Sequence, residues 1–290
     1  MLQFLGTLFA GLLGLAFGSF LNVCLSRWPL GESVVTPRSH CSTCNRTLTW
    51  WENIPLLSWL TLRGRCRTCK TWIGWRCLLV EAAVGGLWAF IGWRCVTQVL
   101  LPSLEDTAIN PPTSLLETFG LLMLCLLLVG LAVLDAEHLW LADVVTIPGA
   151  LLGLVFSLFA ANVMGLSLQP AFWKQLGVRV VEALVAAGLI LLIRWIYWLV
   201  RRREGLGLGD AKLMALLAAW LGLPGALLAF FLGAFLGSLA AVVLLLKSGK
   251  SSENWSQLKL PLGTFLCIGG IVSMLWGKTI LAAYLHWAGI

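Results

Sequence analysis

Two aspartates stand at the ends of long apolar runs, where an acid needs a physical reason to be. Asp135 follows the run 116–134 in "LAVLDAEHLW", and Asp210 precedes the run 212–223 in "EGLGLGDAKL". Ionisable side chains at membrane depth are costly, and they are usually paired or functional. If these runs cross a bilayer in alternating directions, Asp135 and Asp210 lie at similar depth on the same face.

An aspartate pair at one membrane face predicts hydrolytic chemistry. Two carboxyl groups in a partly dry site cannot easily both ionise, so one keeps its proton. The ionised group can take a proton from water while the other protonates a carbonyl oxygen. Gly207 and Gly209 fit an extended or sharply turned backbone before Asp210, which could approach a peptide closely. In the alternative interpretation, Asp210 only caps the helix that follows it.

Asp143 and Lys212 are the charged neighbours of this pair. Asp143 lies eight residues after Asp135, and Lys212 lies two residues after Asp210. Lys212 is expected either to anchor the chain at the positively charged side of the membrane or to bias a nearby carboxylate toward ionisation. Both residues are therefore candidate supporting residues of the site.

The second candidate site consists of four cysteines. They form two C-x-x-C pairs, Cys41 with Cys44 and Cys66 with Cys69, with 21 residues between the pairs. This spacing is typical of structural zinc sites, in which each pair supplies two thiolates to a tetrahedral ion. Two disulfides or four free thiols are the alternatives, and disulfides rarely persist in a reducing compartment. Because four thiolates leave no open position, we expect the zinc to be structural.

The elements that position these groups are apolar helices. The chain has 290 residues, of which 59% are hydrophobic and only 11% charged, whereas soluble domains carry about 25% charged residues. Runs of about 18 or more apolar residues can cross a bilayer as helices. We therefore expect an all-α polytopic membrane protein with about eight transmembrane helices. The spans are predicted at 2–26, 77–100, 116–134, 144–166, 176–200, 212–223 (ending at Leu223-Pro224), 225–246 and 263–286.

Basic residues predict the orientation of these spans. The loops 27–76, 201–212 and 247–262 hold 15 of the 20 Lys and Arg residues. Loops rich in Lys and Arg face the cytoplasm, so the cysteine pairs and both aspartates are expected on the cytoplasmic side. Three parts follow: a first transmembrane helix (1–26), a cytoplasmic zinc-binding insertion (27–76) and a transmembrane core (77–290). The net charge of +7 is then a topology signal that favours anionic lipid over nucleic acid as a partner.

In four segments the chain resembles a known family, the bacterial prepilin peptidases or type IV leader peptidases, which are membrane aspartic proteases of the GxGD type. The segments are "GSFLNVCLSRWP", "WENIPLLSWLTLRGRCRTC", "LDAEHLWLADVVTIP" and "EGLGLGDAKL", and they extend over most of the chain. Three departures are visible. Ala142 stands where the family usually has proline before Asp143, and Cys77 and Leu78 stand where a Tyr-Pro pair is common. Gly263-Thr264-Phe265 stands where Gly-Pro and an aromatic residue are usual.

The resemblance implies that Asp135 and Asp210 are the catalytic pair of an endopeptidase and that the four cysteines belong to a cytoplasmic zinc-binding insertion. Its substrates would be prepilin or pseudopilin precursors, which lose a short basic leader at the cytoplasmic face of the bacterial inner membrane. Some members also methylate the new N-terminus with S-adenosylmethionine, an activity associated with the cysteine-bearing region. The sequence shows no cofactor fingerprint for this second activity.

Three other interpretations compete with the leader peptidase. A presenilin-like intramembrane aspartic protease is the nearest, but the cysteine insertion and "GSFLNV" favour the leader peptidase. A transporter would also have about eight spans and intramembrane acids, yet it predicts acids at mid-membrane depth or an inverted repeat, and neither is clear. A structural anchor for a zinc module would leave Asp135 and Asp210 without a role. The three histidines form no HExxH pattern, and no GxSxG motif occurs.

Overall fold

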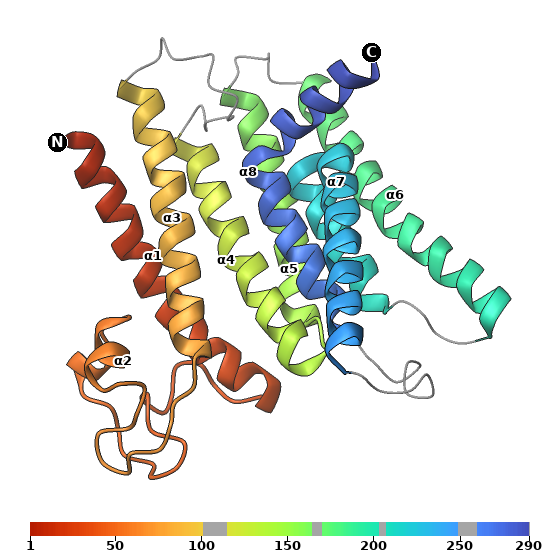
Figure 1. The fold of residues 1–290 in the computed structure, drawn as a ribbon. Coiled ribbons are helices and arrows are strands. Elements are labelled where there is room, and N and C mark those ends of the chain that lie inside the picture. The colour runs from red at the N-terminus through yellow and green to blue at the C-terminus, as the bar shows by residue number, and fades with distance from the viewer. Residues whose placement is uncertain (101–114, 164–169, 203–206, 249–259, 290) are drawn as a thin grey trace. The chain divides into compact units, whose positions relative to one another are not determined.

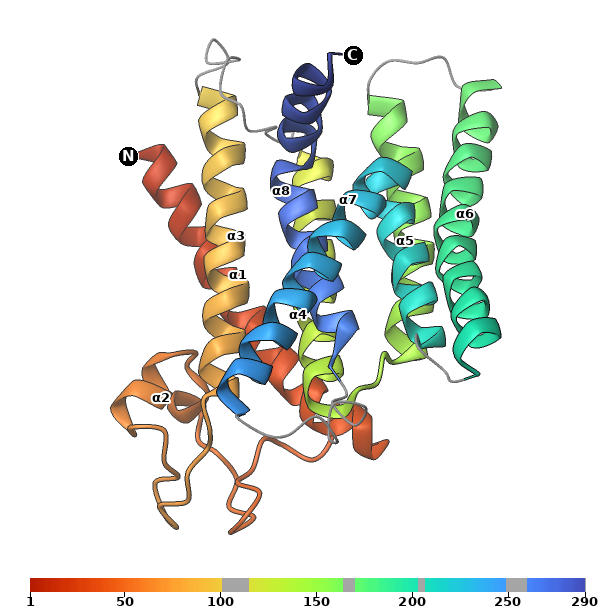
Figure 2. The same ribbon diagram turned by 45° about the vertical axis from the view of Figure 1, so that its right-hand side comes forward.

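The computed structural model describes residues 1–100, 115–163, 170–202, 207–248 and 260–289. Outside the described residues lie the segment 101–114 between the second and third predicted spans, Glu204 of the glycine-rich segment, and the basic residues Arg203, Lys250 and Lys259. Long helices and an irregular insertion make up the described chain (Figures 1 and 2). The helices are α1 (Leu2–Arg27), η1 (Trp28–Leu30), η2 (Trp50–Asn53), α2 (Leu57–Thr61), α3 (Arg76–Leu100), α4 (Leu115–His138), α5 (Asp143–Val163), α6 (Pro170–Arg201), α7 (Leu208–Ser248) and α8 (Leu262–Ala288).

The all-α prediction is confirmed. Apart from helices, the described residues contain only two isolated β-bridges, His40 with Thr47 and Arg65 with Trp72. Long apolar runs favour helices because a helix pairs its backbone N–H and carbonyl groups within its own segment, as a bilayer requires. The cysteine-bearing insertion lies between α1 and α3, as predicted.

The predicted number of eight spans is not confirmed. In the part of the chain that the structure describes, six helices are long and apolar enough to cross a membrane, and the apolar helix over Asp143–Leu158 is shorter. The runs predicted at 212–223 and 225–246 both belong to α7, which breaks at Gly222 with a φ of 75°. Glycine adopts such a left-handed backbone conformation without steric cost. The break therefore falls one residue before the Leu223-Pro224 pair that predicts it.

The chain divides into two compact units, and α4 continues from one into the other after Gly130. In the N-terminal unit, α1 and α3 lie side by side (Figures 1 and 2). A Cβ atom on Gly14 would lie 2.7 Å from the Trp88 side chain, and one on Gly18 would lie 3.0 Å from the Cα of Glu81. Small residues of this kind let membrane helices approach closely and gain van der Waals contacts.

In the C-terminal unit, which begins at Leu131, α7 packs against α5, α6 and α8. The contact with α8 is again close, because a Cβ atom on Gly233 would lie 2.9 Å from the Cα of Leu266. Next to the break in α7, the Ser273 hydroxyl of α8 donates a hydrogen bond of 2.8 Å to the Gly225 carbonyl. These contacts hold the part of α7 that follows the break against α8 within one packed unit.

Candidate active site

Asp135 lies in the last turn of α4, where it is 6% exposed. The backbone N–H of Thr264 donates a hydrogen bond to Asp135 Oδ2 over 2.7 Å, and the Thr264 hydroxyl lies 3.2 Å from the same oxygen. Thr264 is the third residue of α8. The first N–H groups of a helix have no partner within it and carry partial positive charge. The start of α8 therefore provides the polar contacts that a buried carboxylate needs.

Asp210 has a similar setting at the start of α7. It is the third residue of that helix and is 8% exposed. Its Oδ2 accepts a hydrogen bond of 3.0 Å from the backbone N–H of Gly207, the residue just before the helix. A carboxylate at the third helical position reaches back to the preceding N–H in this way in capping boxes. Asp210 thus supports the helix start, but from inside the first turn rather than as its N-cap.

The structure brings the two aspartates into one site. Gly263, whose added Cβ atom would lie 2.9 Å from the Asp135 carboxyl group, and Gly209, directly before Asp210, both pack against Leu141. Leu141, in the short link between α4 and α5, packs beside the starts of α7 and α8. A Cβ atom added to Gly209 would lie 3.0 Å from the Leu141 side chain, and one added to Gly263 would lie 3.1 Å from it. The missing side chain of Gly209 therefore leaves room for Leu141. Neither Gly207 nor Gly209 has a positive φ, and residues 203–206 of the same glycine-rich segment lie outside the described residues.

The two predicted supporting charges pair with each other. Lys212 Nζ lies 2.6 Å from Asp143 Oδ1, joining the start of α7 to the start of α5. The two side chains are 41% and 57% exposed, so water screens the pair. The carboxylate nearest to Lys212 is thus Asp143 rather than Asp135 or Asp210.

Three residues of the site are not found by sequence reasoning: Leu141, Gly263 and Thr264. A Cβ atom on Gly263 would lie 2.9 Å from the carboxyl carbon of Asp135, so only glycine leaves room for the carboxyl group there. The Thr264 hydroxyl also lies 2.9 Å from the carbonyl oxygen of Ala132, one turn before Asp135. The sequence feature that could have indicated this part of the site is the Gly263-Thr264 pair, a glycine followed by a polar residue at the start of the last apolar run.

The four cysteine sulfurs form a second constellation, in the N-terminal unit. All four lie within 4.8 Å of one another, with 3.7 Å between Cys41 and Cys69 and 4.0 Å between Cys44 and Cys66. Four thiolates placed tetrahedrally around an ion at about 2.3 Å lie about 3.8 Å apart. The described cysteines form no disulfide. The arrangement therefore fits a tetrahedral metal ion and excludes the disulfide alternative in this structure.

The two cysteine pairs are structural repeats of one another. The backbone N–H of Cys41 donates to the Arg46 carbonyl, and that of Cys66 donates to the Thr71 carbonyl, over 3.0 and 2.9 Å. Each pair is followed by a residue with positive φ, Asn45 at 54° and Lys70 at 58°. These matching turns present two sulfurs each to the same point. The sequence shows the match as a repeated C-x-T-C, and the backbone geometry extends it through the turn that follows each pair.

Side chains around the cluster act on Cys69 and hold the loop. Hydrogen bonds from the Thr71 hydroxyl and backbone lower the pKa of Cys69 to about 6. Glu52 is buried and accepts hydrogen bonds from the Arg46 guanidinium and from the Thr49 backbone and hydroxyl. The Arg46 contact, followed by the Thr49 contacts, lowers the pKa of Glu52 to about 2. Glu52 is thus an internal tie of the insertion.

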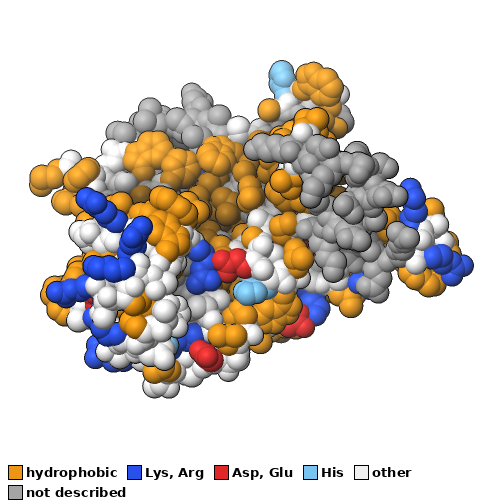
Figure 3. Space-filling view, turned by 60° about the horizontal axis from the view of Figure 1, so that its bottom comes forward, with side chains coloured by type: hydrophobic (Ala, Val, Ile, Leu, Met, Phe, Trp, Pro, Cys, Tyr) orange, Lys and Arg blue, Asp and Glu red, His pale blue; other side chains and the backbone are white. Residues whose placement is uncertain are grey.

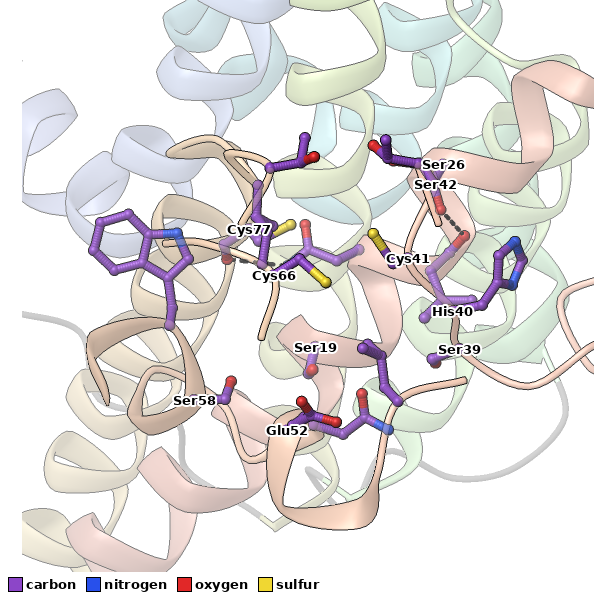
Figure 4. Close-up of a pocket in the computed structure, with 18 of the residues that line it drawn as sticks. Ser19, Ser26, Ser39, His40, Cys41, Ser42, Glu52, Ser58, Cys66 and Cys77 are labelled. Carbon is purple, nitrogen blue, oxygen red and sulfur yellow. Dashed lines mark hydrogen bonds between the residues drawn. The ribbon is translucent and has the colours of Figure 1, made fainter. Parts of the chain in front are cut away.

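A cavity of about 540 Å³ lies in the N-terminal unit beside this cluster. Figure 4 shows its walls: Ser19 and Ser26 come from α1, Cys41 and Cys66 from the two cysteine turns, and Cys77 from the start of α3. Two acceptors lining it are poorly satisfied. Asn22 Oδ1 is buried without a hydrogen-bond partner, and Glu81 is 8% exposed and accepts one hydrogen bond, from the Leu56 N–H.

Two family descriptions match the chain: the Bacterial Peptidase A24 N-terminal domain over residues 12–95 and the Type IV leader peptidase family over residues 121–242. A Stutzerimonas stutzeri protein named prepilin leader peptidase/N-methyltransferase is 33% identical, over 95% of this chain and 92% of its own length. Proteins of the same name from Pseudomonas putida and Myxococcus xanthus are 32% and 36% identical, over 97% and 87% of this chain and 94% and 68% of their own lengths. No solved structure gives a significant match.

Proposed function

This chain belongs to the type IV leader peptidase family, and we propose that it removes the leader of prepilin and pseudopilin precursors with Asp135 and Asp210 as its catalytic pair. The observation that carries the proposal is that two buried carboxyl groups accept hydrogen bonds at the starts of α7 and α8, with Leu141 packed against both starts. Relatives named prepilin leader peptidase/N-methyltransferase cover almost the whole chain. Membership of this family favours the leader peptidase interpretation over a presenilin-like protease or a transporter.

We assign the base to Asp135 and the acid to Asp210. Asp135 Oδ2 has both the N–H and the hydroxyl of Thr264 within reach, whereas Asp210 accepts one N–H. Hydrogen bonds to a carboxylate favour its ionised form. Asp135 then takes a proton from a water molecule while the oxygen of that water adds to the scissile carbonyl carbon. Asp210 protonates the carbonyl oxygen. When the carbon–nitrogen bond breaks, the leaving amine takes the proton from Asp135, and Asp210 recovers its own.

The Thr264 hydroxyl suits both protonation states of Asp135. It has one hydrogen, and two acceptors lie within reach, the Ala132 carbonyl at 2.9 Å and Asp135 Oδ2 at 3.2 Å. With an ionised Asp135 it donates to the carboxylate. With a protonated Asp135 it can donate to Ala132 and accept from the carboxyl group. Thr264 is therefore a positioning residue in the proposed mechanism.

The proposed setting is the bacterial inner membrane, with the pair and the peptidase core (77–290) opening to the cytoplasm. The apolar helices make the protein a multi-pass membrane protein, and the basic loops support the orientation. A cysteine engineered at Arg38, an exposed position of the insertion, should escape an impermeant thiol reagent in intact cells. Ready labelling would reverse the orientation. Membrane lipid is the second proposed partner, and nucleic acid is not one.

Zinc is the proposed ion of the Cys41, Cys44, Cys66 and Cys69 cluster. The sulfur spacings fit a tetrahedral thiolate site. With four thiolates as ligands there is no open position for water or substrate, so the role is structural. These residues tie the two cysteine turns together and so shape one wall of the neighbouring cavity.

A second proposed activity is methylation of the N-terminus that cleavage exposes, with S-adenosylmethionine as the donor. The names of the relatives motivate it, and the cavity of about 540 Å³ has the size of a small-molecule site. Asn22 Oδ1 and Glu81 offer acceptors for the amine and hydroxyl groups of such a ligand. When bound, the donor supplies the methyl group; these residues would hold and orient it.

Purified full-length protein mixed with a model prepilin in detergent tests both activities. Mass spectrometry should show loss of the leader at a single peptide bond and, with S-adenosylmethionine added, one further methyl group on the product. No leader loss from a correctly folded preparation would overturn the peptidase proposal. Leader loss without methylation at saturating donor would overturn only the second activity.

A further inference from the structure

The cysteine module (residues 28–75) holds a second cavity, of about 480 Å³, which four cationic side chains line and no Asp or Glu lines. Arg63, Arg65, Arg67 and Lys70 contribute to its wall, together with Thr61, Leu62, Trp72 and the proposed zinc ligand Cys66. Within the part of the chain that the structure describes, none of the four cations forms an ion pair. Several unpaired cations around one hollow make an attractive site for an anion with several oxygens, such as a phosphate.

An exposed apolar surface adjoins this cationic cavity. We name it the apolar ridge; it consists of Leu57, Leu60, Trp72, Ile73 and Trp75, all of which are exposed. Leu60 and Trp75 are each 57% exposed. Trp72 belongs to both features, since it also lines the cationic cavity. A ligand that suits the whole surface must therefore carry an anionic group and an apolar part side by side.

The two Trp rings of the apolar ridge pack on a third ring. The centroid of Trp59 lies 5.7 Å from that of Trp72 and 4.7 Å from that of Trp75, and the Trp72 and Trp75 centroids lie 5.6 Å apart. Trp59 Nε1 donates a hydrogen bond to the Gly74 carbonyl over 2.9 Å. A Cβ atom on Gly64 would lie 2.7 Å from Trp72 and 2.8 Å from Trp59, so the loop is packed onto the rings. The exposed rings are thus held outward by a packed support, which costs free energy in water and is favourable at an apolar surface.

The position of the apolar ridge fits a membrane surface. Trp75 directly precedes Arg76, where α3 begins, and α3 is one of the candidate membrane spans. In both ribbon views, α2, which carries Leu57 and Leu60, lies level with that end of α3 (Figures 1 and 2). The space-filling view shows Lys and Arg side chains gathered at the left, with hydrophobic side chains exposed among them (Figure 3). Trp residues at the end of a span are typical of the membrane–water interface.

We propose that the module docks on the bilayer surface by binding an anionic phospholipid: the headgroup phosphate lies in the cationic cavity, and the apolar ridge enters the interfacial layer. Arginine pairs with phosphate through two parallel hydrogen bonds. The aromatic rings suit the boundary between headgroups and acyl chains. Free phosphate offers the same headgroup chemistry, but it leaves the apolar ridge in water. The adjoining cavity and ridge therefore favour a lipid, and docking holds both cysteine turns at the membrane.

Native mass spectrometry of the full-length protein tests this proposal, with phosphatidylglycerol or phosphatidylcholine added to the detergent. Wild type should retain phosphatidylglycerol at least tenfold better than phosphatidylcholine. Arg63→Gln/Arg65→Gln should lose most of that preference. The matched control, Arg201→Gln/Arg202→Gln, removes the same charge from two exposed residues at the end of α6 and should change retention less than twofold. Equal retention of both lipids, or loss in the control alone, would overturn the proposal.

A second variant distinguishes a lipid from a free anion. Leu57→Ser/Leu60→Ser leaves every cation in place, so it should reduce phosphatidylglycerol retention severalfold while inorganic phosphate binds as it does to wild type. Unchanged lipid retention in this variant would show that only the charge is recognised. Displacement of the lipid by inorganic phosphate at equal concentration, or by a short single-stranded nucleic acid, would identify a different ligand and contradict membrane docking.

Discussion

At the scale of single residues, each buried aspartate is stabilised by the first turn of a helix. Asp135 accepts the Thr264 N–H at the start of α8, and Asp210 accepts the Gly207 N–H at the start of α7. Burying a polar group without partners costs several kcal/mol, and a helix start supplies donors that would otherwise be unpaired. These hydrogen bonds allow the two acids to remain in an apolar interior, although neither forms an ion pair within the described part of the chain.

Thr264→Val should separate positioning from folding, because valine keeps the backbone N–H and the shape but removes the hydroxyl. A hydrogen bond to a charged group is worth about 1.5–3 kcal/mol, so we expect kcat for leader cleavage to fall about ten- to a hundredfold with little change in KM. Thr264→Ser should retain most of the activity, and the pH–rate profile of the valine variant should shift. Equal activity of all three proteins would remove Thr264 from the mechanism.

Lys212→Met should have a small effect, because its partner is the exposed Asp143 rather than the catalytic pair. Exposed ion pairs contribute about 0–1 kcal/mol, so we expect kcat/KM to fall less than about fivefold. The acid limb of the pH–rate profile should stay where it is. An upward shift of that limb in a correctly inserted Lys212→Met protein would show that the lysine acts on the aspartates after all.

At the scale of elements, the helices could be predicted from the sequence but their contacts could not. Apolar runs reveal membrane helices because nothing else satisfies backbone groups in lipid, and Asp135 and Asp210 are conspicuous because acids in such runs are rare. The role of Thr264 could not be predicted in this way. It donates to Asp135 through its backbone N–H, a group that every residue except proline carries, so the residue type gives no signal. The roles of Leu141 and Gly263 could not be predicted either, because they depend on which helix ends lie next to one another.

Gly263→Ala tests the close approach of α8 to Asp135. The added methyl group would lie 2.9 Å from the carboxyl carbon, so it must displace the carboxyl group or the start of α8. A displacement of about 1 Å in a catalytic site can cost about a hundredfold in rate, and we expect a loss of that size. Gly188→Ala is the matched control, because no atom lies within 4 Å of its Cβ position, and it should cleave normally. Similar losses in both variants would point to general destabilisation.

Zinc removal tests the cysteine module. The protein purified without chelators should contain about one equivalent of zinc, and binding of a structural ion contributes directly to folding. Cys41→Ser should lower the zinc content and increase proteolysis within residues 28–75 more than it lowers leader cleavage. Elemental analysis that finds no zinc in wild type, or full zinc content in Cys41→Ser, would contradict the assignment of these ligands.

At the scale of the whole molecule, two kinds of site lie in two separate packed units. The cysteine cluster, the cavity beside it and the cationic cavity belong to the N-terminal unit, whereas both aspartates belong to the C-terminal unit. The order of spans and the basic loops could be predicted because hydropathy and charge are local properties. The packing of α7 between α5, α6 and α8 could not, since it depends on which glycines face which neighbour, and no sequence period records that.

The most direct test of the aspartate pair is leader cleavage by Asp135→Asn, Asp210→Asn and the double variant. Asparagine keeps the size of the side chain but cannot hold an ionisable proton, and general acid–base groups contribute about a hundred- to ten-thousandfold in rate. Each single variant should lose at least about a thousandfold, and the double variant should be scarcely worse, because the residues act as one unit. Asp143→Asn, with its exposed carboxylate, should lose only part of the activity. Normal cleavage by both single variants, or an active Asp135→Asn beside an inactive Asp143→Asn, would contradict the account.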